Sequence, residues 1–558
     1  MLKHGDLTRA EYNELSQNPI KLSYSVESNY DGQALYFREA VSAELKNWCR
    51  ENGYDLYTSG LKIYTTIDSR MQKYAEEAAA KQMKQVQRNF NNHWGNQEPW
   101  QDENHNVIPN FIEGIAQKQP VYKNLLARFP NNPDSIEYYL NRPHKVKLFD
   151  YEHGTIEKEM STMDSIRYMV HFMHCAFVAM EPQTGAVKAW VGDIDFKSWK
   201  YDKVTAMRQP GSTFKLFVYT EAMNQGLTPC DKRRDEYISM QVYDKAAGKE
   251  VTWAPTNANG SFSGDSIPLK GAFARSINSV AVRLGQEMGI QRIAETAHKM
   301  GIESPLDETP ALALGSSDVN LLELANAYST VANDGKYVRR QLVTRILDRN
   351  GKEIYTSPTN EEQVIPYRSA FLMQQLLMSG LREPGGTSMS LNGYVGQYRD
   401  TDWGGKTGTS NNHSDAWFMG VSPNLVVGAW VGGEYRCIHF RTGALGQGSR
   451  TALPICGYFL EAVLKDPAFS KYRVKFGKPK DESITSSMYN CSSYVPRAKV
   501  DTTLNDSVRV EEEIILDEDG NPVERQLPLS GNKEQQPADQ QQKEHKTPKE
   551  QPVSLENL

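Results

Sequence analysis

The sequence predicts an α+β or mixed domain in which helices cover a sheet. Two β-rich stretches, AFVAMEP and AVKAWVG, are joined at a turn that contains Gly185. Two more stretches, DAWFMGVS and NLVVGAWVGG, follow Trp403 and have the aromatic and β-branched content of strands. Between these groups, helical spacing of apolar residues covers 212–225, 269–288, 290–300 and 320–333. Strands, then helices, then strands indicate one sheet with helices packed against it.

The chain is too long for one ordinary domain and apolar enough to bury a sizeable core. Its 558 residues predict several domains at roughly 150 residues each, and 39% of them are hydrophobic, which excludes a wholly disordered chain. The net charge of −6 is too small to indicate a nucleic-acid surface. No apolar run approaches the roughly 20 residues of a membrane span, and the first residues lack the apolar core of a secretion signal.

Shifts in composition predict four regions, 1–57, 58–165, 166–495 and 496–558. The first has helical spacing, and the third is the packed domain. The second opens with the strand LKIYTTID and a helix that Asp68 can cap with its side-chain oxygen. From 89 to 165 it is polar and rich in Asn and Pro, which predicts an insert with limited regular structure. The fourth region is expected to be disordered from about Leu527, because it has almost no apolar side chains.

The cysteine and histidine spacings predict no metal centre and no cofactor. The six cysteines form no CxxC pair and lie at positions 49, 175, 230, 437, 456 and 491. They are either buried packing thiols or the disulfides of an exported protein, and their spacing reveals no pairing. His171 and His174 form an HxxH, and His413 and His439 come later, but without a third candidate ligand all four are expected to be structural.

The segment RQPGSTFKLFVY places a serine and a lysine at the start of a helix. Pro210 and Gly211 end any preceding helix, so Ser212 lies in the first turn and Lys215 follows on the same face. The Lys215 amine can then reach the Ser212 hydroxyl, provided that burial or nearby positive charge keeps it neutral. Free N–H groups at the helix start can stabilise an oxyanion. The alternative is a capping serine with a solvated lysine, because the SxxK spacing also begins at Ser59 and Ser530.

Two later segments carry further candidate residues. In RSINSVAVRL, Ser276 and Asn278 lie two apart just before a helix, where both could face a cleft; a capping serine with a turn asparagine is the alternative. In WGGKTGTSNN, Lys406 and Thr407 can hold an anion, and Gly408 lets a ligand approach the backbone. A charged edge strand that resists aggregation is the alternative there.

Together, SxxK, SxN and KTG resemble the three motifs of the penicillin-binding protein and serine β-lactamase superfamily. Surrounding stretches narrow the resemblance to the class A penicillin-binding proteins, the bifunctional peptidoglycan synthases: GLKIYTTIDSRMQ, MEPQTGAVKAWVG, RQPGSTFKLFVY, ALGSSDVNLLELANAYSTVANDG and KTGTSNNHSDAWFMGVSP. The resemblance covers about 60–68 and 175–464. It implies a penicillin-binding transpeptidase fold with a central antiparallel sheet flanked by helices, and a smaller linker region.

The resemblance also marks a departure from the family. Class A members carry a membrane anchor and a glycosyltransferase domain with catalytic glutamates, whereas only about the first 25 residues here resemble the end of that domain. Residues 1–57 are therefore expected to contain a remnant of it, and no glycosyltransferase activity is expected. The family works in the periplasm or at the outer face of the cytoplasmic membrane, with other cell-wall synthesis proteins as partners. Membrane contact is expected only through an N-terminal part missing here.

By resemblance, the chain acts as a serine DD-transpeptidase on stem peptides that end in D-Ala-D-Ala. Ser212 would attack the penultimate carbonyl and Lys215 would accept its proton. Ser276 would relay a proton to the leaving nitrogen, and Asn278 would hold the donor amide. β-Lactams would acylate the same serine as substrate mimics.

The KTG strand completes the site that the resemblance implies. Lys406, Thr407 and Thr409, with Gly408 between the two threonines, would bind the terminal carboxylate, and the N–H groups of Ser212 and Thr409 would form the oxyanion hole. Two other functions stay open: a carboxypeptidase or β-lactamase-like hydrolase, in which water opens the acyl-enzyme, and a non-catalytic module that binds cell-wall fragments.

Overall fold

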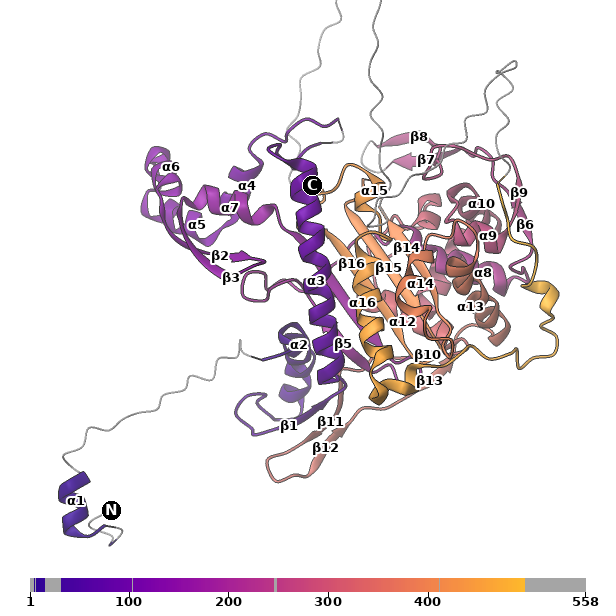
Figure 1. The fold of residues 1–558 in the computed structure, drawn as a ribbon. Helices are drawn as coiled ribbons and strands as arrows, with labels where there is room; N and C mark the ends of the chain where they lie inside the picture. The colour runs from indigo at the N-terminus through magenta and orange to yellow at the C-terminus, as the bar shows by residue number, and fades with distance from the viewer. Residues whose placement is uncertain are drawn as a thin grey trace, which may run out of the picture. The chain divides into compact units, whose positions relative to one another are not determined.

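The computed structural model describes residues 5, 7–15, 32–102, 104–244, 248–410 and 412–496. Contacts divide the chain into two units, Met1–Tyr494 and Val495–Leu558. Every helix and strand described below belongs to the first unit and is labelled in Figure 1 where there is room. The disorder predicted from about Leu527 concerns residues outside the described part of the chain.

A five-stranded antiparallel sheet forms the centre of the first unit (Figure 1). Its strands lie in the order β14 (Gly404–Thr409), β15 (Asp415–Val421), β16 (Val426–Gly433), β4 (Met173–Met180) and β5 (Val187–Val191). Strands β4 and β16 are buried along their whole length. The predicted α+β class and central antiparallel sheet are therefore confirmed, and strands form on both sides of Gly185 and after Trp403, as expected.

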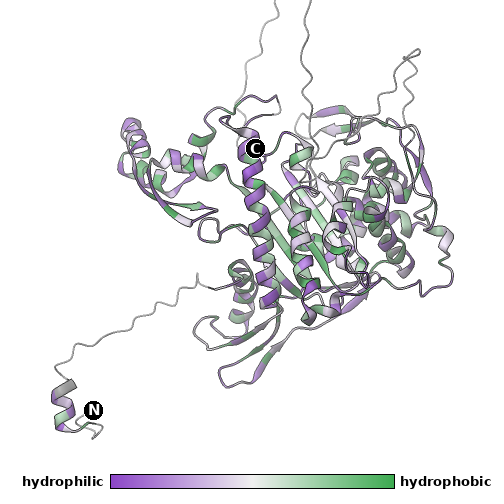
Figure 2. Cartoon of the chain, viewed as in Figure 1, coloured by the Kyte–Doolittle hydropathy of each residue, from purple (hydrophilic) through white to green (hydrophobic). Residues whose placement is uncertain are grey.

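Alternate residues of the sheet pack into two separate apolar cores. One face, which includes Phe177 and Phe418, joins the core formed with α3 (Ser69–Trp94) and α16 (Ala452–Lys465). The other face, with Val178 and Met419, packs against α8 (Lys215–Asn224), α12 (Leu321–Ala332) and α13 (Tyr367–Arg382). Successive side chains of a strand point to opposite faces, so a sheet covered on both sides needs apolar residues throughout. Figure 2 shows the central strands in hydrophobic colours.

The helical pattern predicted as one unit over 269–288 forms two helices, α9 (Leu269–Ala274) and α10 (Asn278–Met288). Ser276 ends α9 because it has the left-handed conformation, with φ +59°. The amides of Ser276 and Ile277 bond back to the carbonyls of Phe273 and Ala272, which is the usual way to close a helix at a left-handed residue. The break leaves Ser276 and Ile277 between the two helices, and Asn278 begins α10.

The other helices of this region are short. They are α11 (Ile290–Lys299), α14 (Asn392–Val395), α15 (Gly443–Gly446) and the 3-10 segments Gly211–Phe214, Pro310–Leu314, Met389–Leu391, Pro467–Tyr472 and Ser486–Met488. Two pairs of short strands lie between α8 and α9: β6 (Lys232–Arg234) with β9 (Ser266–Pro268), and β7 (Met240–Asp244) with β8 (Lys249–Trp253).

The N-terminal part contains α1 (Arg9–Leu15), α2 (Leu35–Glu51) and β1 (Lys62–Thr65). Strand β1 pairs with β11 (Val343–Leu347), which pairs with β12 (Glu353–Thr356); β10 (Lys336–Val338) pairs with β13 (Glu361–Gln363). As predicted, Asp68 caps α3, because its side chain accepts hydrogen bonds from the amides of Arg70 and Met71.

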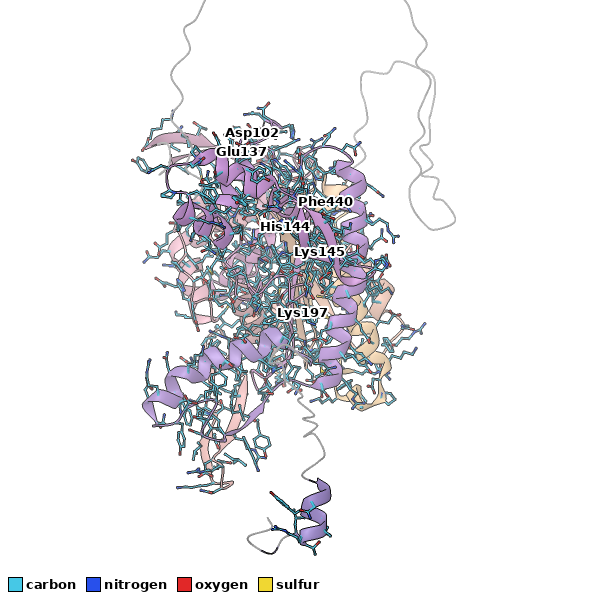
Figure 3. The ribbon with its side chains drawn as sticks, turned by 90° about the vertical axis from the view of Figure 1, so that its left-hand side faces the viewer. Asp102, Glu137, His144, Lys145, Lys197 and Phe440 are labelled. Carbon is cyan, nitrogen blue, oxygen red and sulfur yellow. A yellow bond between two sulfur atoms is a disulfide. The ribbon has the colours of Figure 1, made fainter. Side chains whose placement is uncertain are left out.

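The limited regular structure predicted for residues 89–165 is wrong. After α3 the chain forms α4 (Phe111–Lys118), α5 (Pro120–Arg128), α6 (Pro133–Asn141), β2 (His144–Asp150), β3 (Gly154–Met160) and α7 (Thr162–Val170). The Asn and Pro residues that suggested loops instead start helices: Pro120 and Pro133 lie in first turns, and the Asn132 side chain accepts from the Ser135 amide. Figure 3 labels Glu137 of α6 and His144 and Lys145 of β2 in this part.

Both outcomes left open for the cysteines occur. Cys230 and Cys491 form a disulfide, and the four other cysteines, at 49, 175, 437 and 456, are buried free thiols. The disulfide ties the segment after α8 to a residue 261 positions later. Of the helices in the described ranges, none combines the length and the apolar character needed to cross a membrane.

Candidate active site

The three predicted motifs line one cleft of about 910 Å³. Ser212, Ser276, Asn278, Thr407 and Thr409 all contribute to its wall. The remaining wall comes mainly from residues 253–258, 311–316, 386–390 and 447–450. The sequence segments are far apart, and the fold brings them together at the edge strand β14, which faces the 3-10 segment before α8.

Two glycines let that strand touch the segment that carries Ser212. Gly211 has φ +52°, and a Cβ added there would lie 2.6 Å from the Thr409 carbonyl oxygen. A Cβ on Gly408 would collide with the Pro210 carbonyl and lie 2.9 Å from Thr213 Cγ2. In the direction of a Cβ, the space beside Gly408 is thus occupied by this chain's own Pro210 and Thr213.

Ser212 lies in the first turn of the helical segment, as its sequence predicts. The 3-10 segment Gly211–Phe214 passes directly into α8 at Lys215. Hydrogen bonds of 2.8 Å from Thr213 Oγ1 to the Pro210 carbonyl and from the Tyr328 hydroxyl to the Thr213 carbonyl brace this turn. The Ser212 side chain itself is partly buried and faces the cleft.

Lys215 is fully buried, and its amine contacts the SxN loop. Nζ donates to the Ser276 carbonyl at 2.8 Å, to Ser276 Oγ at 3.2 Å and to Asn278 Oδ1 at 2.7 Å. Among the hydrogen bonds of the described residues, none joins this amine to the Ser212 hydroxyl three residues before it. The predicted direct bond is therefore not formed in this state, although catalytic hydrogen bonds are often long before substrate binds.

Asn278 is held at both ends of its side-chain amide. Oδ1 accepts from Lys215, and Nδ2 donates to the Thr256 carbonyl at 2.8 Å. The Asn278 backbone amide donates to Asn257 Oδ1 at 2.9 Å, and Asn257 is held in turn by Asp235 at 2.7 Å. This network sets the orientation of the start of α10.

Lys406 reaches the same serine from the KTG strand. Its Nζ donates to Ser276 Oγ at 2.9 Å and to the Thr407 carbonyl at 2.9 Å. Thr407 Oγ1 donates to Thr387 Oγ1 at 2.7 Å, and Thr409 Oγ1 accepts from the Gly448 amide at 3.2 Å. The Ser276 hydroxyl is consequently the point where the three motifs meet.

Lys215 and Lys406, the two buried lysines that contact Ser276, have lowered pKa values. Burial, followed by the positive charge of Lys406, moves the pKa of Lys215 well below its ordinary value. Burial also lowers the pKa of Lys406 to about 7. No Asp or Glu belongs to the described residues that line the cleft, so no carboxylate there offsets these effects. When it loses a proton, the Lys215 amine keeps two N–H donors and gains a lone pair, which can accept a proton from a serine hydroxyl.

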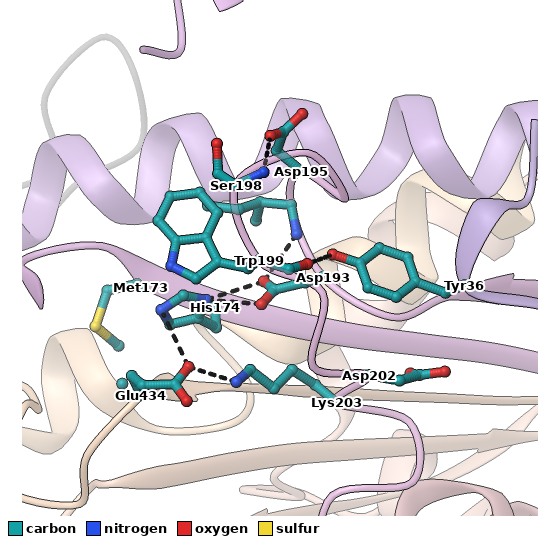
Figure 4. A network of polar contacts seen from close by, with 12 residues as sticks. Tyr36, Met173, His174, Asp193, Asp195, Ser198, Trp199, Asp202, Lys203 and Glu434 are labelled. Carbon is teal, nitrogen blue, oxygen red and sulfur yellow. Dashed lines mark hydrogen bonds and ion pairs between the residues drawn. The ribbon is translucent and has the colours of Figure 1, made fainter. Parts of the chain in front are cut away.

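The predicted structural histidines lie in different surroundings. His174 is buried, with Nδ1 2.8 Å from Asp193 and Nε2 3.8 Å from Glu434, in the network of Figure 4. His171 and His439 each contact a backbone carbonyl through a ring nitrogen. Within the described ranges, no group of three or more His, Cys, Asp or Glu residues could hold a metal ion.

Sequence reasoning missed several residues of the cleft. Asn257 orients the SxN loop, Thr387 contacts the KTG strand, and Gly448 reaches Thr409. His413 and Arg275 also line the wall. Two of them had a signal in the sequence: Arg275 directly precedes Ser276, and His413, which was expected to be structural, follows Thr409 by four residues. Asn257, Thr387 and Gly448 reach the site through long-range contacts.

Comparison with known proteins places these motifs in a family. The description "Penicillin binding protein transpeptidase domain" matches residues 175–430, which contain all three motifs, and "Penicillin-binding protein middle domain" matches 95–173. The chain belongs to the penicillin-binding protein family. The middle-domain match coincides with the stretch whose helices and hairpin the sequence analysis missed.

Relatives agree with this assignment. Penicillin-binding protein 1A of Neisseria flavescens is 28% identical over 497 residues, which cover 83% of this chain and 60% of that protein. Penicillin-binding protein 1A of Rickettsia conorii is 28% identical over 528 residues, covering 85% and 63%. The chain therefore spans about 60% of the length of these relatives.

Solved penicillin-binding proteins share the fold. The crystal structure of penicillin-binding protein 1A from Haemophilus influenzae matches with a TM-score of 0.62 and 23% identity, covering 86% of this chain and 76% of that one. PonA1 from Mycobacterium tuberculosis in complex with penicillin V matches with a TM-score of 0.52 and 22% identity, covering 77% and 92%.

Proposed function

We propose that this protein is a serine DD-transpeptidase that cross-links peptidoglycan stem peptides through an acyl-enzyme at Ser212. One observation carries the proposal: Lys215, a buried lysine with a strongly lowered pKa, contacts Ser276 and Asn278 in the cleft that Ser212 lines. The match to a penicillin-binding transpeptidase domain supports the same reaction class.

Acylation begins when Ser212 Oγ attacks the carbonyl carbon of the penultimate D-Ala and Lys215 Nζ takes the hydroxyl proton. Residues three apart share a helix face, so a small movement of either side chain brings the two groups together. The carbonyl oxygen becomes an oxyanion, which the N–H groups of Ser212 and Thr409 would stabilise by about 3 kcal/mol. The close contact of β14 with the helix start, which Gly211 and Gly408 allow, supports this assignment.

The tetrahedral intermediate then collapses, and its C–N bond breaks. Ser276 Oγ accepts hydrogen bonds from Lys215 and Lys406, which leaves its own proton available for the departing nitrogen of D-Ala. Lys215 holds the proton taken from Ser212 and can return it to Ser276. Asn278 orients Lys215 through Oδ1 and contacts the donor amide.

The KTG strand binds the terminal carboxylate of the donor peptide. Thr407 and Thr409 lie two apart on β14, so both face the cleft, and protonated Lys406 supplies the positive charge. A β-lactam with a carboxylate next to its ring amide presents the same groups, and would acylate Ser212.

The amine of a second stem peptide opens the acyl-enzyme and forms the cross-link. Because stem peptides lie outside the cytoplasmic membrane, we propose that the protein works there. If water replaced the amine, the protein would be a carboxypeptidase or a β-lactamase-like hydrolase, and a non-catalytic module would form no acyl-enzyme.

Fluorescent penicillin tests the nucleophile. The wild-type protein should be labelled covalently, with a mass increase equal to the intact antibiotic, and Ser212→Ala should lose all labelling while keeping its thermal midpoint. Thr213→Ser is a suitable control, because Thr213 faces its own backbone. Full labelling of Ser212→Ala would reject the assignment.

A model peptide that ends in D-Ala-D-Ala, offered with an amine acceptor, separates the three functions. We expect the amide product of transfer to exceed the hydrolysis product. Hydrolysis alone would indicate a carboxypeptidase. If the protein released no D-Ala and penicillin did not label it, it would be a binding module.

A further inference from the structure

The cleft contains a positively charged side chain that the proposed reaction does not use. Arg275 directly precedes Ser276 and lines the cleft. Its Nε is buried and has no hydrogen-bond partner. Among the described residues, no carboxylate oxygen lies within 4.0 Å of its guanidinium. An unpaired arginine on the wall of a cleft can bind an anion.

The surroundings hold the Arg275 guanidinium in place without neutralising it. The guanidinium carbon lies 5.4 Å from the centre of the Tyr494 ring, a cation–π contact. On another side it packs so closely on Gly385 that a Cβ there would come within 2.8–2.9 Å of its atoms. Neither contact is a hydrogen bond, and among the described residues no hydrogen bond uses the terminal N–H groups of Arg275.

Tyr494 is itself anchored to the domain. Its hydroxyl donates to Asp265 Oδ2 at 2.9 Å, and the neighbouring Ser493 donates to Glu383 Oε1 at 3.1 Å. Three residues before Tyr494, Cys491 forms the disulfide with Cys230. This C-terminal segment, Cys491–Tyr494, therefore supports Arg275 from outside the cleft.

Arg275 also lies close to the reacting groups. Its neighbour Ser276 accepts hydrogen bonds from Lys215 and Lys406. Gly385, which packs on the guanidinium, comes two residues before Thr387, the partner of Thr407. Arg275 and Thr407 therefore both contact the segment 385–387.

The overall charge of the cleft favours a ligand with more than one negative charge. The described residues that line it include Arg275 and Arg450 but no acidic residue. Lys406, bonded to Ser276 at the wall, adds another cation. One terminal carboxylate would leave this charge largely unmatched.

We infer that Arg275 binds a second carboxylate of the donor peptide, carried by the side chain of the residue before D-Ala-D-Ala. The arginine thereby selects donors with a free carboxylate over donors in which that group is an amide. The guanidinium fork fits a carboxylate through two parallel hydrogen bonds, which an amide cannot reproduce. This inference rests on the proposed transpeptidase function.

The test uses two synthetic donor peptides that differ only in whether this side chain ends in a carboxylate or an amide. For Arg275→Ala we expect kcat/KM for acylation by the carboxylate peptide to fall about 10- to 100-fold, as for loss of a charged hydrogen bond. The kcat/KM for acylation by the amide peptide should change less than about threefold. Arg275→Lys should retain part of the preference. Arg292→Ala, which removes an exposed arginine from α11, should retain all of it.

Tyr494→Leu tests how Arg275 is positioned. Without the aromatic ring, the preference for the carboxylate peptide should shrink in the same direction as in Arg275→Ala but by less. Equal losses for both peptides in the two variants would overturn the inference and show a structural role. No loss, or a loss confined to transfer to the acceptor amine, would also overturn it. If wild-type protein failed to react with penicillin, the proposed function would fail instead.

Discussion

Four lysines are buried in the described part of this protein, and they fall into two pairs with different surroundings: Lys203 and Lys270, and Lys215 and Lys406. Lys203 contacts Glu434 beside His174 in the network of Figure 4, and Lys270 lies 3.0 Å from Glu383. The hydrogen bonds of Lys215 and Lys406 go to carbonyl, amide and hydroxyl oxygens, and both lysines donate to the same serine.

We propose that this difference separates structural lysines from lysines that take part in the reaction. Burial disfavours a charged amine, but a neighbouring carboxylate offsets that effect. For Glu434, burial acts to raise the pKa, yet His174, Lys203 and Arg208 together lower it. At Lys215 and Lys406 no carboxylate intervenes, so burial lowers their pKa. Perturbed groups of this kind are concentrated at active sites.

Replacement of Lys215 should have the largest effect on activity. In Lys215→Met, acylation by penicillin should slow by about 10²- to 10⁴-fold, the usual contribution of a general base. The thermal midpoint should stay the same or rise, because the change leaves no carboxylate without a partner. Stopped-flow labelling and calorimetry measure the two quantities. A rate within tenfold of wild type would show that Lys215 is not the base.

The opposite pattern is expected at Glu434. Glu434→Gln leaves the buried Lys203 ammonium without its counter-charge, and should lower the free energy of unfolding by about 3 kcal/mol. Acylation by the folded protein should be unchanged. Urea denaturation with Glu361→Gln as control checks this, because Glu361 pairs with Lys336 at an exposed site and should contribute less than about 1 kcal/mol. Equal losses in both variants would contradict the comparison.

The two cleft lysines predict a bell-shaped pH profile of acylation. The rate should fall at acid pH as Lys215 gains a proton, and fall at alkaline pH as Lys406, with a pKa of about 7, loses the charge that holds the carboxylate. Lys406→Arg should shift the alkaline limb upward, because arginine stays protonated. An unchanged alkaline limb in this variant would assign that limb to another group.

The same lowered pKa makes stability depend on pH. Between pH 7 and the ordinary lysine pKa of about 10.4, the unfolded chain binds a proton at Lys406 that the folded protein does not, so stability rises with pH over this window. Below pH 7 the Lys406 amine is protonated in both the folded and the unfolded protein, so the full cost of burying its charge lowers the stability. Lys406→Met should flatten this rise relative to wild type, as measured by urea denaturation at pH 7 and pH 9.

The smallest effect is expected at Thr387. Thr387→Val removes the hydroxyl that accepts from Thr407, and should slow acylation by up to about tenfold, the value of one hydrogen bond. Ser390→Ala, another hydroxyl on the cleft wall, is the matched control and should leave the rate unchanged. If Ser390→Ala lowered the acylation rate more than Thr387→Val, Thr407 would not depend on its hydrogen bond with Thr387.

Much of the site was predictable from local patterns, and the failures share one cause. Ser212 follows Pro210 and Gly211, so its place in a first turn is a short-range property, as is the Asp68 cap. The Asn and Pro residues at the starts of α5 and α6 carry the same signal as loops, and only apolar contacts such as those of Phe111 and Ile112 show that helices form nearby. Sequence spacing could not show that Ser276 would break a helix.

The sequence by itself determined the class of the fold, the strands of the central sheet and the three motifs, because alternation, helical spacing and turn residues act over a few neighbouring positions. Only the tertiary structure decided what each motif touches. Lys215 and Lys406 lose their usual basicity, Gly408 accommodates Pro210, and Arg275 stacks on Tyr494. Each of these depends on burial and on contacts between residues far apart in the chain, which no local pattern encodes.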